Sequence, residues 1–162
     1  MKRILAAVAR LLPFALAAEA SIGRHSPEAA VSAAYEADQA AIQGRGAGIM
    51  GDNVLRARFF SRSLLRSIAA DEVIAGVRNG PPAVLRDPFS DQAPHMAALS
   101  VAPVSEGRDE AKVQAEFARG DGARERLTYD MVFEHGEWRV DDIVYATLDG
   151  QSHTLRGLLA AN

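Results

Sequence analysis

The residue that most favours a chemical role is Asp142, a carboxylate within an otherwise apolar strand face. Residues 125–145 alternate apolar and polar side chains in two arms that meet at His135-Gly136, which predicts a β-hairpin with a two-residue turn. A type I′ turn needs positive φ at both positions, which glycine adopts freely and histidine tolerates. In this register Glu134 opposes Glu137, Phe133 opposes Trp138, Met131 opposes Val140, Tyr129 opposes Asp142, and Leu127 opposes Val144. Asp142 is then the one carboxylate on a face made of Leu127, Tyr129, Met131, Phe133, Trp138, Val140 and Val144.

Asp142 and Tyr129 would form a catalytic pair in this register. A carboxylate on an apolar face loses hydration unless it is paired, so such groups are candidates for functional sites. Asp142 could then act as a general base, with the Tyr129 phenol as its hydrogen-bonding partner. The structural alternative is that Asp141-Asp142 forms a β-bulge, which would rotate one carboxylate outward, or that Asp142 pairs with Arg58 or Arg62 of a covering helix.

Other chemical motifs in the sequence are weak. Residues 46–51 match the G-x-G-x-x-G pattern, but they follow a predicted helix, whereas a dinucleotide-binding loop follows a strand, so we interpret them as a connector. The histidines at 25, 95, 135 and 153 lack the spacing of metal ligands, and neither a metal nor another cofactor is predicted. The chain has no cysteine, which excludes disulfides and a cysteine nucleophile. The row Arg58, Arg62 and Arg66 is typical of a solvated helix face.

These candidates lie on a predicted α+β framework. Ser26-Pro27-Glu28 combines a capping hydroxyl, a proline and an acid, which predicts a helix from there to about Ile42. Asp52-Asn53 caps a second helical segment, from Val54 to about Val77, with a break near Ser61. Strands are expected at about 96–104 and 111–117 and in the two hairpin arms, and residues 155–160 are expected as a short helix or a tail. This order predicts N-terminal helices packed on one face of a curved, four-stranded antiparallel sheet.

The first twenty residues are typical of a secretory signal peptide. Lys2, Arg3 and Arg10 form the basic region, residues 11–18 are apolar, and Ala18-Glu19-Ala20 matches a small-x-small cleavage site. The alternative is an amphipathic helix that is retained. Cleavage would leave a single domain of residues 21–162 in the periplasm or outside the cell, with no membrane span in the mature chain. It removes three basic residues and one acidic residue, so the net charge changes from -3 to -5, which disfavours nucleic acid as a partner.

A family resemblance rests on residues spread over about 26–160. They are Phe60, Ser61 and Leu64, then Asp87-Pro88-Phe89, and finally Gly136, Trp138, Arg139, Asp141, Asp142, Ile143 and Tyr145. In this pattern the chain resembles an exported bacterial family of unknown function within the nuclear-transport-factor-2-like superfold. The resemblance implies a cone-shaped curved sheet wrapped by helices, often with a pocket, and no established activity, since the superfold hosts enzymes, binders and scaffolds. The residues expected to line such a pocket are Tyr35, Phe59, Phe89, Tyr129, Met131, Trp138 and Asp142.

Three functions remain open from the sequence. We expect an exported, non-catalytic domain that binds a small apolar molecule or a protein partner, with a homodimer through the exposed sheet face as one form of partnership. The second is an isomerase-like or dehydratase-like enzyme with Asp142 as general base and Tyr129 as its partner. The third is an inhibitor or immunity-type interaction module. A pocket containing a solvent-linked carboxylate would favour the enzyme, whereas a filled interior would favour an interaction module.

Overall fold

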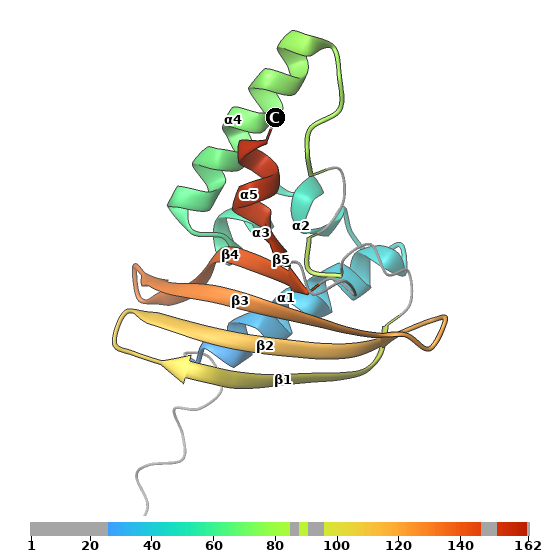
Figure 1. Ribbon diagram of the computed structural model, residues 1–162, viewed down its shortest axis with the longest axis vertical. Helices are drawn as coiled ribbons and strands as arrows, with labels where there is room; N and C mark the ends of the chain where they lie inside the picture. The colour runs from blue at the N-terminus through green and yellow to red at the C-terminus, as the bar shows by residue number, and fades with distance from the viewer. Residues whose placement is uncertain (1–25, 85–87, 91–95, 147–151, 162) are drawn as a thin grey trace, which may run out of the picture.

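The computed structural model describes residues 26–84, 88–90, 96–146 and 152–161 of the chain. The fold is α+β, with helices followed by an open antiparallel sheet in the strand order β1-β2-β3-β4-β5 (Figure 1). The helices are α1 (Pro27–Ile42), α2 (Gly48–Gly51), α3 (Asn53–Phe59), α4 (Arg62–Arg78) and α5 (Leu155–Ala160). The strands are β1 (Met96–Glu106), β2 (Glu110–Arg119), β3 (Arg124–Glu134), β4 (Glu137–Ala146) and β5 (Ser152–Thr154). The expected signal peptide lies outside the described residues.

Helices α1 and α3 start at the predicted capping residues. The Ser26 hydroxyl accepts a hydrogen bond from the Ala29 N–H, and Pro27 occupies the first helical position of α1. Asp52 caps α3 in the same way, through the N–H groups of Val54 and Leu55. These side chains satisfy donors that have no partner within the helix. The expected connector at 46–51 is in part helical, because Gly48–Gly51 forms α2 and buries Ile49.

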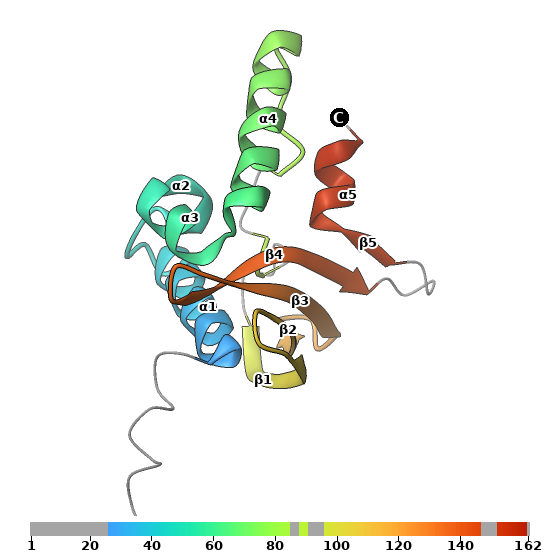
Figure 2. The same ribbon diagram turned by 90° about the vertical axis from the view of Figure 1, so that its left-hand side faces the viewer.

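The predicted break near Ser61 is confirmed and positions α4. Phe60 and Ser61 are extended, Phe60 forms a parallel bridge with Val140, and the Ser61 N–H donates to the Val140 carbonyl at 2.8 Å. The chain therefore pairs briefly with β4 before α4 begins. As a result only part of the helical layer covers the sheet: α1 lies against one face, whereas α4 starts at the β4 side and extends away from the sheet (Figures 1 and 2).

The sheet has five strands instead of the expected four. The additional strand, β5, pairs with the end of β4 through Val144↔Thr154 and Tyr145↔His153, and α5 follows directly. Three residues are too few to show period-2 alternation in the sequence, so no strand was predicted there. Of the two alternatives expected for residues 155–160, a short helix or a tail, the structure contains the helix. At the other side, β1 forms the edge of the sheet and contains Pro103, as expected for a residue without an N–H.

The predicted register of the central hairpin is confirmed from the turn to the pair Met131↔Val140 and is wrong beyond that pair. His135 and Gly136 both have positive φ, and Glu134↔Glu137, Phe133↔Trp138 and Met131↔Val140 pair as predicted. A bulge then intervenes, so that Asp130 opposes Asp142 and Tyr129 opposes Ile143. The buried residues of β4 are accordingly Trp138 and Val140 before the bulge and Ile143 and Tyr145 after it. Leu127 therefore opposes Tyr145, not Val144, and Val144 lies off the buried face.

Candidate functional site

Asp142 is held by backbone donors and not by Tyr129. Its Oδ1 atom accepts hydrogen bonds from the N–H groups of Ile143 at 2.8 Å and of Arg156 at 3.0 Å. The Arg156 N–H belongs to the first turn of α5, where helix N–H groups lack partners within the helix. Both Asp141 and Asp142 are half-buried, because the bulge removes both from the buried face. The β-bulge predicted as the structural alternative at Asp141-Asp142 is therefore the arrangement found in the structure.

Tyr129 is fully buried and makes its hydrogen bonds within the core. Its hydroxyl lies 2.6 Å from the Tyr35 hydroxyl and donates to the Phe89 carbonyl at 3.3 Å. In the same way, the Tyr145 hydroxyl donates to the Pro88 carbonyl at 3.3 Å. The two tyrosines of β3 and β4 thereby bind the backbone of the Pro88-Phe89 segment. This arrangement gives Tyr129 a positioning role in the core and does not bring its hydroxyl to Asp142.

Asp141 joins three elements at the bulge. Its Oδ1 atom accepts from the Ser61 hydroxyl at 2.5 Å and from Arg156 Nη2 at 2.6 Å. The same Ser61 hydroxyl accepts from the Leu64 N–H and caps α4, while Arg156 Nε donates to the Asp141 carbonyl. The arginine predicted to pair with Asp142 was Arg58 or Arg62. In the structure the guanidinium of Arg156 pairs instead with Asp141, and Asp142 accepts only the backbone N–H of Arg156. The pair Asp141-Asp142 therefore ties the first turns of α4 and α5 to β4.

Most of the residues expected to line a pocket pack on one another. Phe89 is sandwiched between Phe60, with ring centroids 5.6 Å apart, and Tyr129, with centroids 5.5 Å apart. Tyr35 contacts Phe89 and Phe117 edge-on. Six of the seven expected residues belong to one cluster of buried side chains, namely Tyr35, Phe59, Phe89, Tyr129, Met131 and Trp138. Asp142, the seventh, lies outside that cluster and among the half-buried residues of β4.

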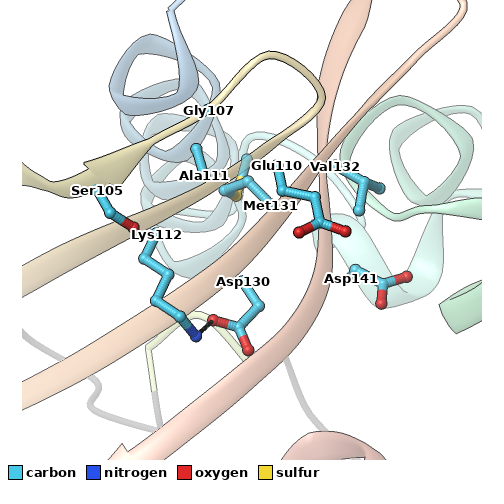
Figure 3. Close-up of a pocket in the computed structure, with 9 residues that line it drawn as sticks. All are labelled: Ser105, Gly107, Glu110, Ala111, Lys112, Asp130, Met131, Val132 and Asp141. Atoms are coloured by element: carbon cyan, nitrogen blue, oxygen red, sulfur yellow. Dashed lines mark hydrogen bonds and ion pairs between the residues drawn. The ribbon is translucent and has the colours of Figure 1, made fainter.

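A hollow of about 390 Å³, lined by both polar and apolar residues, lies near the β1–β2 turn (Figure 3). The residues that line it are Ser105, Gly107, Glu110, Ala111, Lys112, Asp130, Met131, Val132 and Asp141. Lys112 forms an ion pair with Asp130 at 2.5 Å, and Asp141 is engaged by Arg156. Among the described residues, no ion pair or hydrogen bond uses the Glu110 carboxylate. The hollow therefore offers Glu110 to a positively charged group.

The hollow and the helix ends contain few other chemical groups. Within the described ranges, no three or more histidines, aspartates and glutamates are grouped so that they could hold a metal ion. Arg62 contacts the ring of His135 at 2.6 Å, and Arg58 lies over the Phe59 ring at 5.1 Å from its centroid. Arg58, Arg62 and Arg66 are all exposed, as predicted for a solvated face, and Arg62 also contacts the hairpin turn. No helix of the described part of the chain is long and apolar enough to cross a membrane.

Sequence reasoning missed Arg156 and Glu110. Arg156 lies in a segment expected to be a short helix or a tail, and its role depends on β5 placing α5 beside the bulge. In the sequence Arg156 is marked only by its position two residues after Thr154. Thr154 caps α5 by accepting a hydrogen bond from the Gly157 N–H. Glu110 lies at the start of β2 and carries no signal that distinguishes it from other strand-end acids.

Comparisons of the chain with known protein families, curated proteins and solved structures give no match.

Proposed function

We propose that the protein is an exported, non-catalytic module that binds another protein. The observation that carries this proposal is the engagement of Asp142 Oδ1 by two backbone N–H groups, at 2.8 Å and 3.0 Å. A general base must reach a proton of the substrate, and its hydrogen-bonding partner must be near. Asp142 instead accepts the Arg156 N–H from the first turn of α5, and Tyr129 is buried against Tyr35 and Phe89. This use of the two residues disfavours the isomerase-like or dehydratase-like alternative.

The packing of the interior favours a protein over a small apolar molecule as the partner. Sites for small ligands are concave and mostly apolar. In this chain the apolar residues expected to line such a site fill one another's space, as in the stack of Phe60, Phe89 and Tyr129. The hollow of about 390 Å³ lies at the surface and combines apolar lining residues with four charged ones, namely Glu110, Lys112, Asp130 and Asp141. A charged hollow of this size suits a side chain of a partner better than a free apolar molecule.

The partner group that the hollow fits best is an arginine or lysine side chain. The Glu110 carboxylate is available, whereas Asp130 is neutralised by Lys112 and Asp141 by Arg156. An arginine can donate two parallel hydrogen bonds to one carboxylate, and arginine is enriched among the residues that dominate binding energy at interfaces. We accordingly propose a basic segment of a partner protein as the occupant.

The fold relationship and the compartment belong to the same proposal. The order of helices and antiparallel strands, with α1 against the sheet, is compatible with the nuclear-transport-factor-2-like cone that the resemblance implies. The signal-like residues 1–20 support export to the periplasm or beyond.

Site-specific photo-crosslinking in the periplasm of the source organism tests the proposed function. A photoreactive residue at Glu110 is expected to capture a partner protein, whereas the same residue at Asp121, in the turn between β2 and β3, is expected to capture none. Glu110→Lys should prevent capture by a photoreactive residue placed at Ser105, and Asp121→Lys should leave that capture unchanged. Equal capture at the two sites would contradict the proposal. A turnover that Asp142→Asn abolishes in a folded protein would establish the enzyme instead.

A further inference from the structure

Of the nine described residues that line the hollow near the β1–β2 turn, only Lys112 is basic (Figure 3). It follows Glu110 by two positions on β2 and lies directly opposite Asp130 on β3. Because side chains two apart on a strand point to the same face, Glu110, Lys112 and Asp130 share one face of the sheet. Glu110 and Asp130 are diagonal neighbours on the two strands, and Cβ atoms in such pairs lie about 7–8 Å apart. Lys112 is therefore a neighbour of both carboxylates.

The charges of the hollow leave one carboxylate for an incoming group. Lys112 Nζ pairs with Asp130 Oδ1 at 2.5 Å. Arg156 Nη2 pairs with Asp141 Oδ1 at 2.6 Å. Within the part of the chain that the structure describes, the Glu110 carboxylate takes part in no hydrogen bond or ion pair. A single positive charge is therefore enough to balance the hollow.

We propose that Lys112 determines specificity by restricting the hollow to one isolated arginine of the partner segment, an inference that rests on the proposed function of the hollow. In an extended segment, side chains two residues apart lie on the same side and about 6.6 Å from each other. If the first basic side chain binds Glu110, a second one at that spacing falls beside Asp130. There it has to displace Lys112, which its own strand keeps at a high local concentration. A like charge placed against the unwanted partner is a general source of specificity.

An arginine suits the surroundings of Glu110 better than a lysine does. Its planar guanidinium can donate two parallel hydrogen bonds to one carboxylate, whereas an ammonium is a strongly hydrated point charge. The lining also includes Ala111, Met131 and Val132, along which the aliphatic part of an arginine can pack. Val132 lies directly opposite Glu110 in the register, so the apolar contact and the carboxylate are adjacent. The favoured segment therefore has an arginine without a basic residue two positions away.

Two acetylated and amidated peptides test this preference, one with the sequence Gly-Arg-Gly-Ala-Gly and one with Gly-Arg-Gly-Arg-Gly. Their dissociation constants are measured from changes in the backbone amide NMR signals of the recovered protein at physiological salt, where attraction between distant charges is screened. The unmodified chain should bind both peptides through Glu110, with little gain in affinity from the second arginine. In Lys112→Met that gain should rise about two- to fivefold, because the exposed ion pair with Asp130 no longer has to be broken.

Two further variants serve as controls. Arg126→Met removes an equal charge from the same sheet face outside the hollow, where Arg126 pairs with Glu116 at 2.6 Å, and should leave the gain as it is in the unmodified chain. Lys112→Arg keeps the charge and should also leave it unchanged.

The outcomes separate this inference from the proposed function. An equal gain in Lys112→Met and Arg126→Met would overturn the role of Lys112. The proposed function would still stand if Glu110→Gln abolished the binding of both peptides. If neither peptide changed the signals of the residues that line the hollow, the cation site itself would be overturned, and the role of Lys112 with it.

Discussion

Arg156 and Asp141 join the terminal helix to the edge of the central hairpin. Arg156 Nη2 donates to the Asp141 carboxylate at 2.6 Å, and Nε donates to the Asp141 carbonyl at 2.8 Å. The carboxylate also accepts from Ser61, which caps α4. One bulge in β4 therefore fixes the starts of two helices that are far apart in the sequence. The neighbouring Asp142 completes the junction through the Arg156 N–H.

Asp142→Asn is expected to lower the free energy of unfolding by about 1–3 kcal/mol, because a charged acceptor is weakened while its two backbone donors remain in place. Chemical denaturation measures the change. The matched control is Asp130→Asn, which removes an exposed ion pair with Lys112 and should cost about 0–1 kcal/mol. If Asp142 were instead a strained catalytic base, the same change would leave the stability unchanged or raise it. That result would contradict the role of Asp142 as an acceptor for the N–H groups of Ile143 and Arg156.

Trp138→Ala should destabilise the fold by about 3–5 kcal/mol, because a large core side chain and its ring contact with Phe133 are both lost. Trp138 is buried, and the two ring centroids lie 5.2 Å apart. Glu137→Ala, at the exposed turn next to it, should stay within about 0.5 kcal/mol. The two variants are compared by urea denaturation. Equal midpoints would show that Trp138 does not contribute to the core as described.

The sequence predicted the helix caps at Ser26 and Asp52, the break near Ser61 and the hairpin turn, because each of these depends on a few adjacent residues. The cap at Ser26 and the positive φ of His135 and Gly136 are such local features. The register beyond Val140 is not local. A bulge changes it by one position, and the bulge is stabilised by Ser61 and Arg156, which are distant in the sequence.

The candidate site could be predicted only as two alternatives for the same reason. Residue type and alternation placed Asp142 beside Tyr129, whereas the two contacts that hold Asp142 come from its neighbour and from α5. The bulge predicted as an alternative at Asp141-Asp142 is confirmed, whereas the predicted pairing of Asp142 with Arg58 or Arg62 is replaced by the ion pair of Asp141 with Arg156. Strand β5 brings Arg156 there, and three residues give too little pattern to reveal a strand.

Processing of the N-terminus gives a prediction that is independent of the folded domain. Mass spectrometry of the protein from a Gram-negative periplasm should show a chain that begins at Ser21, because Ala18-Glu19-Ala20 matches the cleavage pattern. Ala18→Arg should block cleavage, because a large charged side chain replaces a small one at that pattern, and Arg24→Ala should not. An intact Met1 on soluble cytoplasmic protein would contradict export.

The hydroxyl pair of Tyr35 and Tyr129 offers the last test, which measures whether the Tyr129 hydroxyl stabilises the core through its contact with Tyr35. The two oxygens are 2.6 Å apart and both residues are buried. Tyr129→Phe should cost about 1–3 kcal/mol in the free energy of unfolding, because the Tyr35 hydroxyl and the Phe89 carbonyl lose a partner in a buried place. Tyr35→Phe should cost a similar amount, and the double variant should cost less than the sum of the two, since groups in direct contact are not additive. Chemical denaturation of the four proteins completes the cycle, with Tyr145→Phe, whose hydroxyl binds Pro88, as the comparison outside the pair. Additive effects of Tyr35→Phe and Tyr129→Phe would show that the two hydroxyls do not interact, and the positioning role assigned to Tyr129 would then be wrong.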